Sequence, residues 1–101
     1  PNLKDFLKLD EESFRKLFST TSIKRIGRNR FIRNVLIAIG NSEEENFIED
    51  IIPLLNDKSN LVRAMAVWAL SQLCKKEKFE KLKTHYFHLE YDQDVIKEWG
   101  L

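Results

Sequence analysis

The chain has 101 residues, 43% of them hydrophobic and 33% charged, with a formal net charge of +1, values normal for one soluble globular domain. The single cysteine, Cys74, excludes an internal disulfide framework and cannot by itself hold an iron–sulfur cluster. No apolar run approaches the ~20 residues that a membrane-spanning helix needs. The chain starts at Pro1 rather than at Met, so we expect a piece of a longer protein.

Positive charge is concentrated in one part of the chain. No acidic residue lies between Ser13 and Ser42, whereas that segment holds seven basic residues, namely Arg15, Lys16, Lys24, Arg25, Arg28, Arg30 and Arg33. Acidic blocks flank it at residues 10–12 and 43–45. Segregated charge of this kind produces a strong local field although the total is close to zero.

The first half of the chain predicts three helices. Asp10 is a good N-cap for a short helix ending near residue 18, and Ser19–Ser22 reads as a loop. A second helix is predicted over residues 28–39, with Gly40 as its C′ residue. At ~100° per residue its core face holds Phe31, Ile32, Val35, Leu36, Ala38 and Ile39, and the opposite face holds Arg30, Arg33, Asn34, Ile37 and Asn41. A capping box of Ser42 and Glu45 predicts the start of the third helix, which Pro53 should kink or shorten.

Three more helices are predicted in the second half, over residues 61–76, 76–89 and 92–101. The first carries Val62, Ala66, Ala69 and Leu73 on one stripe. Trp68 and Trp99 lie 31 residues apart and Val62 and Val95 lie 33 apart, an imprecise repeat in the range of helical-hairpin solenoids. The sequence therefore predicts a single all-α domain over residues 1–101, a short α-solenoid of about five to six helices.

Two stretches resemble known families. The segment LLNDKSNLVRAMAVWALSQL resembles a HEAT repeat. The segment FRKLFSTTSIKRIGRNRFIRNVLIAIGNS resembles the C-terminal HEAT-like domain of epoxyqueuosine reductases, through an R-x-G-R-x-R-x-x-R-N motif that runs into an apolar helix ending in Gly-Asn. The motif residues here are Arg25, Gly27, Arg28, Arg30, Arg33, Asn34, Gly40 and Asn41.

This resemblance implies a role in tRNA modification. The family reduces epoxyqueuosine to queuosine at the wobble position of the tRNA anticodon, using a cobalamin and two [4Fe–4S] clusters in parts that precede the HEAT-like domain. The chain has no C-x2-C-x2-C-x3-C-P run, so we expect no catalytic or cofactor-binding residue in it and no cofactor of its own. It is expected to be the non-catalytic tail of such an oxidoreductase, a cytoplasmic protein that contacts tRNA and the upstream catalytic and iron–sulfur domains.

The candidate RNA-binding residues are Lys24, Arg25, Arg28, Arg30, Arg33 and Asn34. Such side chains, beside the N-terminus of a helix, suit RNA phosphates. The alternative is that these arginines pair with the acidic blocks and stabilise the fold. At the level of function, the alternative is a HEAT-like scaffold that binds a protein, with the basic face meeting an acidic partner.

Other polar and aromatic residues have more ordinary interpretations. Asn34 could instead bond to a loop backbone, Asn41 could end a helix in a left-handed conformation, and Gly27 could serve the turn. In HEAT-like hairpins an arginine such as Arg63 braces the turn through an acid, here predicted to be Asp57. Trp68 and Trp99 are expected to pack in the core rather than to stack on bases. His85 and His88 share a helix face, but no second pair of ligands supports a metal site.

Overall fold

The computed structural model describes residues 2–100, in which all regular secondary structure is helical, so the all-α prediction is confirmed. The α-helices are α1 (Leu3–Leu7), α2 (Glu11–Leu17), α3 (Arg28–Gly40), α4 (Ile48–Ile51), α5 (Asn60–Leu73), α6 (Lys76–Tyr86) and α7 (Gln93–Glu98). Short 3₁₀ helices lie between them at η1 (Ser22–Ile26), η2 (Glu45–Phe47), η3 (Ile52–Asn56) and η4 (Phe87–Leu89). None of the helices in this range has the length and apolar character needed to cross a bilayer.

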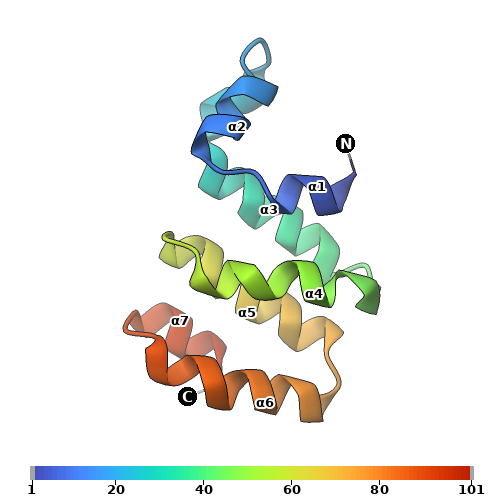
Figure 1. Cartoon of the computed structure of the whole chain (residues 1–101), viewed down its shortest axis with the longest axis vertical. Coiled ribbons are helices and arrows are strands. Elements are labelled where there is room, and N and C mark those ends of the chain that lie inside the picture. Colours follow the sequence, from blue (N-terminus) through green and yellow to red (C-terminus); the bar gives the residue numbers. More distant parts are fainter. Residues whose placement is uncertain (1, 101) are drawn as a thin grey trace.

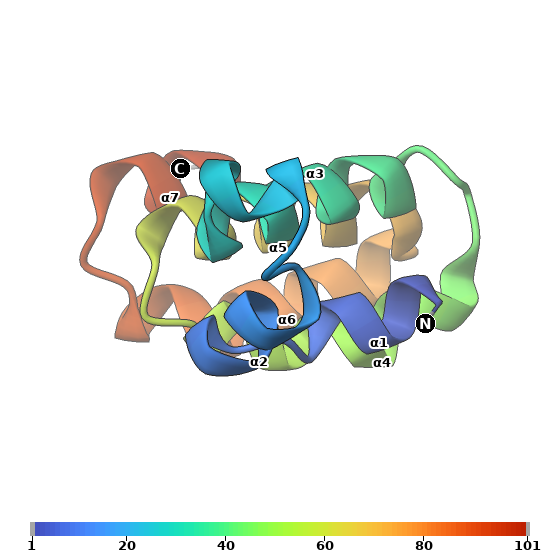
Figure 2. The same cartoon turned by 90° about the horizontal axis from the view of Figure 1, so that it is seen from above.

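The helices form two layers. Helices α3, α5 and α7 lie side by side in one layer, and α1, α2, α4 and α6 form the other (Figure 2). Along the longest axis of the molecule, successive hairpins stack on one another in chain order (Figure 1). The chain measures 42 × 28 × 16 Å, and the predicted stack of helical hairpins is confirmed.

The core lies between the two layers and draws on both of them. Helices α3 and α5 contribute many of its fully buried side chains, among them those of Ile32, Leu36, Ile39, Val62, Ala66 and Ala69. The predicted core face of α3 is correct except at Ala38, which is exposed. Phe31 is half-buried and packs in an aromatic cluster with Phe6, Phe14 and Phe18, which joins α1, α2 and α3.

Gly40 corrects the prediction for the end of this helix. It is the last residue of α3 rather than a left-handed C′ residue, and Asn41, which follows, has right-handed backbone angles (φ −86°, ψ −7°). The reason for glycine is space, because a Cβ at position 40 would lie 3.0 and 3.1 Å from two carbons of the Trp68 ring and closer to a third. Gly40 therefore lets α5 approach α3 closely, which makes it a packing residue.

Replacing Gly40 by valine should lower the free energy of unfolding by about 2 kcal/mol, because Trp68 or the α3 backbone must move to admit the side chain. Ala38→Val is the matched control, since Ala38 lies exposed on the same helix and the control adds the same β-branched group. Urea unfolding of both variants measures the difference. Equal losses would show that the space around Gly40 is not restrictive.

The third predicted helix begins later than its capping box indicated. The Ser42 hydroxyl donates to the carbonyl of Ile39 at 2.6 Å and accepts from the N–H of Glu44 at 3.2 Å, so it closes the turn after α3 instead of capping a new helix. The chain enters η2 at Glu45, and α4 starts only at Ile48. The prediction for Pro53 is confirmed, because α4 ends at Ile51 and continues as the 3₁₀ helix η3.

Helix α1 lies outside the predicted elements. Its N-cap is Asn2, whose side-chain oxygen accepts from the N–H of Asp5 at 3.1 Å, while the Asp5 carboxylate accepts from the N–H of Asn2 at 3.2 Å. This reciprocal pair is a capping box, so a local signal for α1 was present in the sequence.

The turns between hairpins are joined by two equivalent contacts. The first residue of α3, Arg28, donates to the carboxylate of Asp57 in the next turn at 2.8 and 2.9 Å. The first residue of α5, Asn60, donates to Asp92 in the following turn at 2.8 Å. Each aspartate also accepts from the N–H two residues later along the chain. We call these two contacts the turn links; they hold neighbouring hairpins in register.

Candidate nucleic-acid interface

The basic segment folds as two consecutive helices separated by a glycine. Lys24 and Arg25 lie exposed on η1, which ends where the N–H of Gly27 donates to the carbonyl of Lys24 at 3.3 Å. Gly27 has φ 83°, a left-handed conformation that other residues rarely adopt, and α3 begins directly after it. The prediction that Gly27 serves the turn into the helix is confirmed.

Arg30 and Arg33 lie on the outer side of α3, where Arg30 is exposed and Arg33 is half-exposed. The side-chain oxygen of Asn34 accepts from Nε and Nη2 of Arg33 at 3.2 and 3.1 Å. Asn34 therefore holds the neighbouring guanidinium rather than the backbone of a loop. Its own side chain is exposed beside that of Arg33.

Four of the basic residues predicted to bind RNA have no acidic partner in the part of the chain that the structure describes. The ion pairs there are formed by Lys4, Arg15, Arg28, Arg63 and Lys78. Lys24, Arg25, Arg30 and Arg33 are absent from this set, and we call these four residues the basic surface. Of the flanking acidic blocks, only Glu11 forms an ion pair within residues 2–100, and its partner is Arg15.

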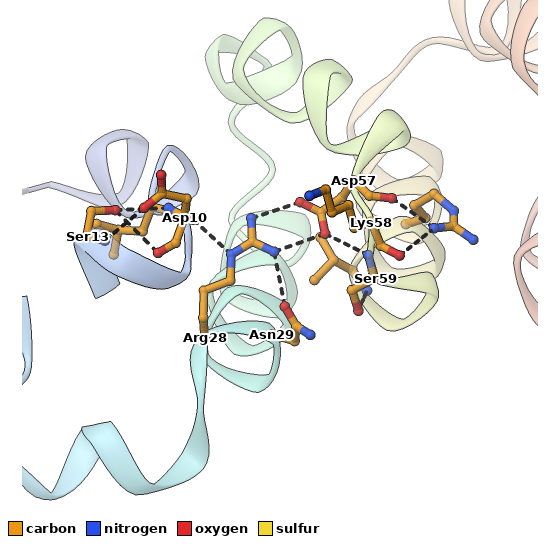
Figure 3. Close-up of polar contacts among 10 residues, drawn as sticks. Asp10, Ser13, Arg28, Asn29, Asp57, Lys58 and Ser59 are labelled. Atoms are coloured by element: carbon orange, nitrogen blue, oxygen red, sulfur yellow. Dashed lines mark hydrogen bonds and ion pairs between the residues drawn. The ribbon is translucent and has the colours of Figure 1, made fainter. Parts of the chain in front are cut away.

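Arg28, which also belongs to the predicted RNA-binding set, has an acidic partner within the fold. Its guanidinium forms a two-pronged ion pair with Asp57, and Nε donates to the carbonyl of Leu9 at 2.8 Å (Figure 3). Only 11% of each side chain in the pair is exposed. Arg28 therefore joins the α2–α3 hairpin to the turn before α5, and we leave it out of the basic surface.

Arg63 braces the turns, as predicted, but the acid is not Asp57. Nε and Nη2 of Arg63 donate to the two carboxylate oxygens of Glu90 at 2.9 and 3.1 Å. Nη1 donates to the carbonyl oxygens of Asp57 and Lys58, and the guanidinium lies 5.3 Å from the centre of the Tyr91 ring. The hydrogen bonds to Glu90 raise the pKa of Arg63, so the guanidinium stays charged in its buried position.

The two tryptophans differ in burial. Trp99 is 2% exposed and packs against Phe79, whereas Trp68 is half-buried beside Gly40. Burial raises the pKa of the Cys74 thiol, so a smaller fraction of it is the reactive thiolate at neutral pH.

No group of three metal-ligating side chains occurs in residues 2–100, and His85 and His88 have no further ligand there. A single cysteine does not fit a [4Fe–4S] cluster, which takes four thiolates. The iron–sulfur clusters that the resemblance implies would therefore need thiolates from outside this chain.

Comparison with known proteins agrees with the resemblance seen in the sequence. The HEAT repeat family model matches residues 47–76, which span α4, η3 and α5. Epoxyqueuosine reductase of Salmonella typhimurium is 29% identical over 76 residues, which cover 75% of this chain and 20% of that protein. The Escherichia coli protein of the same name is 29% identical over 71% of this chain and 19% of its own length.

A third epoxyqueuosine reductase, from Alicycliphilus denitrificans, is 34% identical over 62% of this chain and 20% of its own length. The chain thus spans about a fifth of the length of the curated relatives that it matches. No solved structure gives a significant match. The chain therefore contains a HEAT repeat and is related in sequence to part of the epoxyqueuosine reductases, which confirms the predicted resemblance.

Proposed function

We propose that the chain is a non-catalytic, RNA-contacting part of an epoxyqueuosine reductase-like enzyme. In this proposal residues 1–101 form one HEAT-like domain at the C-terminal end of a longer protein. Its ligand is tRNA near the anticodon, where queuosine is formed, and its location is the cytoplasm. The cobalamin and the two [4Fe–4S] clusters belong to the upstream domains, against which this domain packs.

The observation that carries the proposal is the basic surface. Lys24, Arg25, Arg30 and Arg33 lie on two consecutive helices and form no ion pair within residues 2–100. The N-terminus of α3 lies among them, capped by Gly27 without a side-chain hydrogen bond and with no acidic residue in its first turn. Its N–H groups and the helix dipole add to the attraction for a phosphate. This arrangement suits the contact of several phosphates without the reading of bases.

The test is tRNA binding by the double variant Arg30→Glu, Arg33→Glu over a range of salt concentrations. We expect affinity to fall about ten-fold or more, and the slope of log affinity against log salt to become shallower by about 2, because two phosphate contacts are lost. Fluorescence anisotropy with labelled tRNA measures both quantities.

The control is Lys76→Glu, Lys81→Glu, which makes the same change in net charge on exposed positions of α6, in the other layer. This variant should keep the wild-type slope. If Arg30→Glu, Arg33→Glu also keeps the wild-type slope, the basic surface is not the RNA contact. Capture of an acidic protein without RNA by the wild-type chain would favour the alternative, a HEAT-like scaffold for protein binding.

A further inference from the structure

An apolar groove opens on the outer side of the α3–α5–α7 layer and has a volume of about 520 Å³. Five side chains form its apolar lining, Ile37 from α3 and Leu61, Ala64, Met65 and Trp68 from α5. Ile37 is 36% exposed and Leu61 is 37% exposed. Ile37 is also the one apolar residue on the otherwise polar face of α3 that the periodicity of the sequence singled out.

The groove continues directly from the basic surface. Arg30, Arg33, Ile37 and Asn41 follow one another at intervals of three or four residues, so they form one stripe along α3. One turn of helix, ~6 Å of rise, separates Arg33 from Ile37. A ligand whose anionic groups contact Arg30 and Arg33 therefore lies beside the mouth of the groove.

The opposite rim of the groove is acidic. Asp94 and Glu98 of α7 line it, both exposed, and their carboxylates form no ion pair or side-chain hydrogen bond within residues 2–100. Lys97, which also lines this rim, is exposed between them. Across the layer, the order is thus cationic on α3, apolar on α5 and mainly anionic on α7.

This order matches the parts of a single nucleotide. The phosphate is anionic, the faces of the base are apolar and stack on aromatic side chains, and an exocyclic amino group donates to carboxylates. Leu61 to Trp68 spans ~10 Å along α5, the same length as the i and i+7 anchors of a docked helix. The charge order across the groove, rather than its length, favours a nucleotide over a helix.

We propose that the apolar groove receives one unstacked base that carries an exocyclic amino group, from the same RNA whose phosphates contact the basic surface. This inference rests on the proposed function and adds a base contact to it. The phosphate contacts position the RNA, and the groove selects adenine, cytosine or guanine over uracil at one nucleotide.

The test compares binding of two single-stranded oligonucleotides of equal length, oligoadenylate and oligouridylate, by the wild-type chain. Both have the same number of phosphates, so the basic surface gives both the same salt slope, and the groove should give oligoadenylate about five- to ten-fold higher affinity. In the variant Asp94→Asn, Glu98→Gln this preference should shrink. In Leu61→Ala, Met65→Ala the affinity for oligoadenylate should fall with no change in the salt slope, because no phosphate contact is lost.

The control is Leu89→Ala, which removes an apolar side chain that is 66% exposed and lies outside the groove. It should bind both oligonucleotides as the wild type does. Circular dichroism and urea unfolding confirm that each variant is folded.

Three outcomes would overturn the inference. In the first, the wild type binds both oligonucleotides with equal affinity while its salt slope still depends on Arg30 and Arg33. That result would support the proposed function and show that the groove binds no base. Absence of any RNA binding would remove the proposed function as well. Self-association of the chain that Leu61→Ala, Met65→Ala abolishes would assign the groove to a second copy.

Discussion

Replacing Glu90 by alanine should lower the free energy of unfolding by about 3–5 kcal/mol, because the Arg63 guanidinium then stays buried without its counter-charge. Each side chain of this pair is only 7% exposed, so water cannot replace the lost carboxylate. Asp92 also loses an acceptor, since its N–H donates to Glu90 at 3.1 Å. Urea unfolding followed by circular dichroism measures the loss.

Glu49→Ala is the matched control for this change. Glu49 pairs with Lys78 at a comparable distance of 3.2 Å, but its side chain is 74% exposed. Its loss should cost no more than about 1 kcal/mol. The double variant Arg63→Met, Glu90→Leu should recover part of the loss, though not all, because the carbonyl groups of Asp57 and Lys58 lose their donor. Similar losses in Glu90→Ala and Glu49→Ala would contradict the bracing role of Arg63.

The variant Asp57→Asn should lower the free energy of unfolding at neutral pH by about 3 kcal/mol, because it removes the charge that balances Arg28, whose side chain is only 11% exposed. The substitution keeps the shape of the side chain, so the loss reports the charge and the acceptor oxygen that the amide lacks, rather than packing. Asp50→Asn is the control, since Asp50 pairs with Lys4 at 3.4 Å in a more exposed position. That control should change stability by less than about 1 kcal/mol.

The same variant should also change how stability depends on pH. Burial alone would raise the pKa of Asp57, but the hydrogen bonds from Arg28 and from the N–H of Ser59 outweigh it and hold the pKa below its usual value. The unfolded chain therefore binds this proton first as the pH falls through ~3.9, and the stability that Asp57 contributes is lost below that pH. It is fully present above it.

Unfolding measured between pH 7 and pH 2 checks this dependence. The wild type should lose stability more steeply than Asp57→Asn below pH ~4, so the two curves should converge. Some acid loss should remain in the variant, because hydrogen bonds also lower the pKa of Asp10, chiefly from the N–H of Ser13, and the pKa of Asp92, chiefly from Asn60. Parallel curves would show that the charge of Asp57 contributes nothing to stability.

Helical periodicity was a reliable guide wherever a helix was long and one-sided. The repeat of Val62, Ala66 and Ala69 predicted the buried stripe of α5, and the arc of Ile32, Leu36 and Ile39 did the same for α3. Both stripes face another helix, so the interior repeats every three or four residues and leaves a trace in the sequence.

The sequence did not predict the contacts of residues whose partners lie far along the chain. Arg28 and Arg30 look alike in the sequence, but Asp57, 29 residues away from Arg28, accepts from that guanidinium. Arg63 likewise bonds to Glu90, 27 residues on, rather than to the nearby carboxylate of Asp57. In the sequence Gly40 resembles a helix terminator, whereas in the structure the ring of Trp68 occupies the space beside it. Local spacing carries no information about such contacts, which depend on how the hairpins stack.

The turn links bear on how such a protein can change in length. Each link uses the first residue of one helix, Arg28 or Asn60, and an aspartate in the next turn, Asp57 or Asp92. A duplicated hairpin that brings its own pair of residues could enter the stack without breaking either existing contact, since each hairpin meets only its neighbours. The array can therefore gain or lose units during evolution while the surface of α3 stays unchanged.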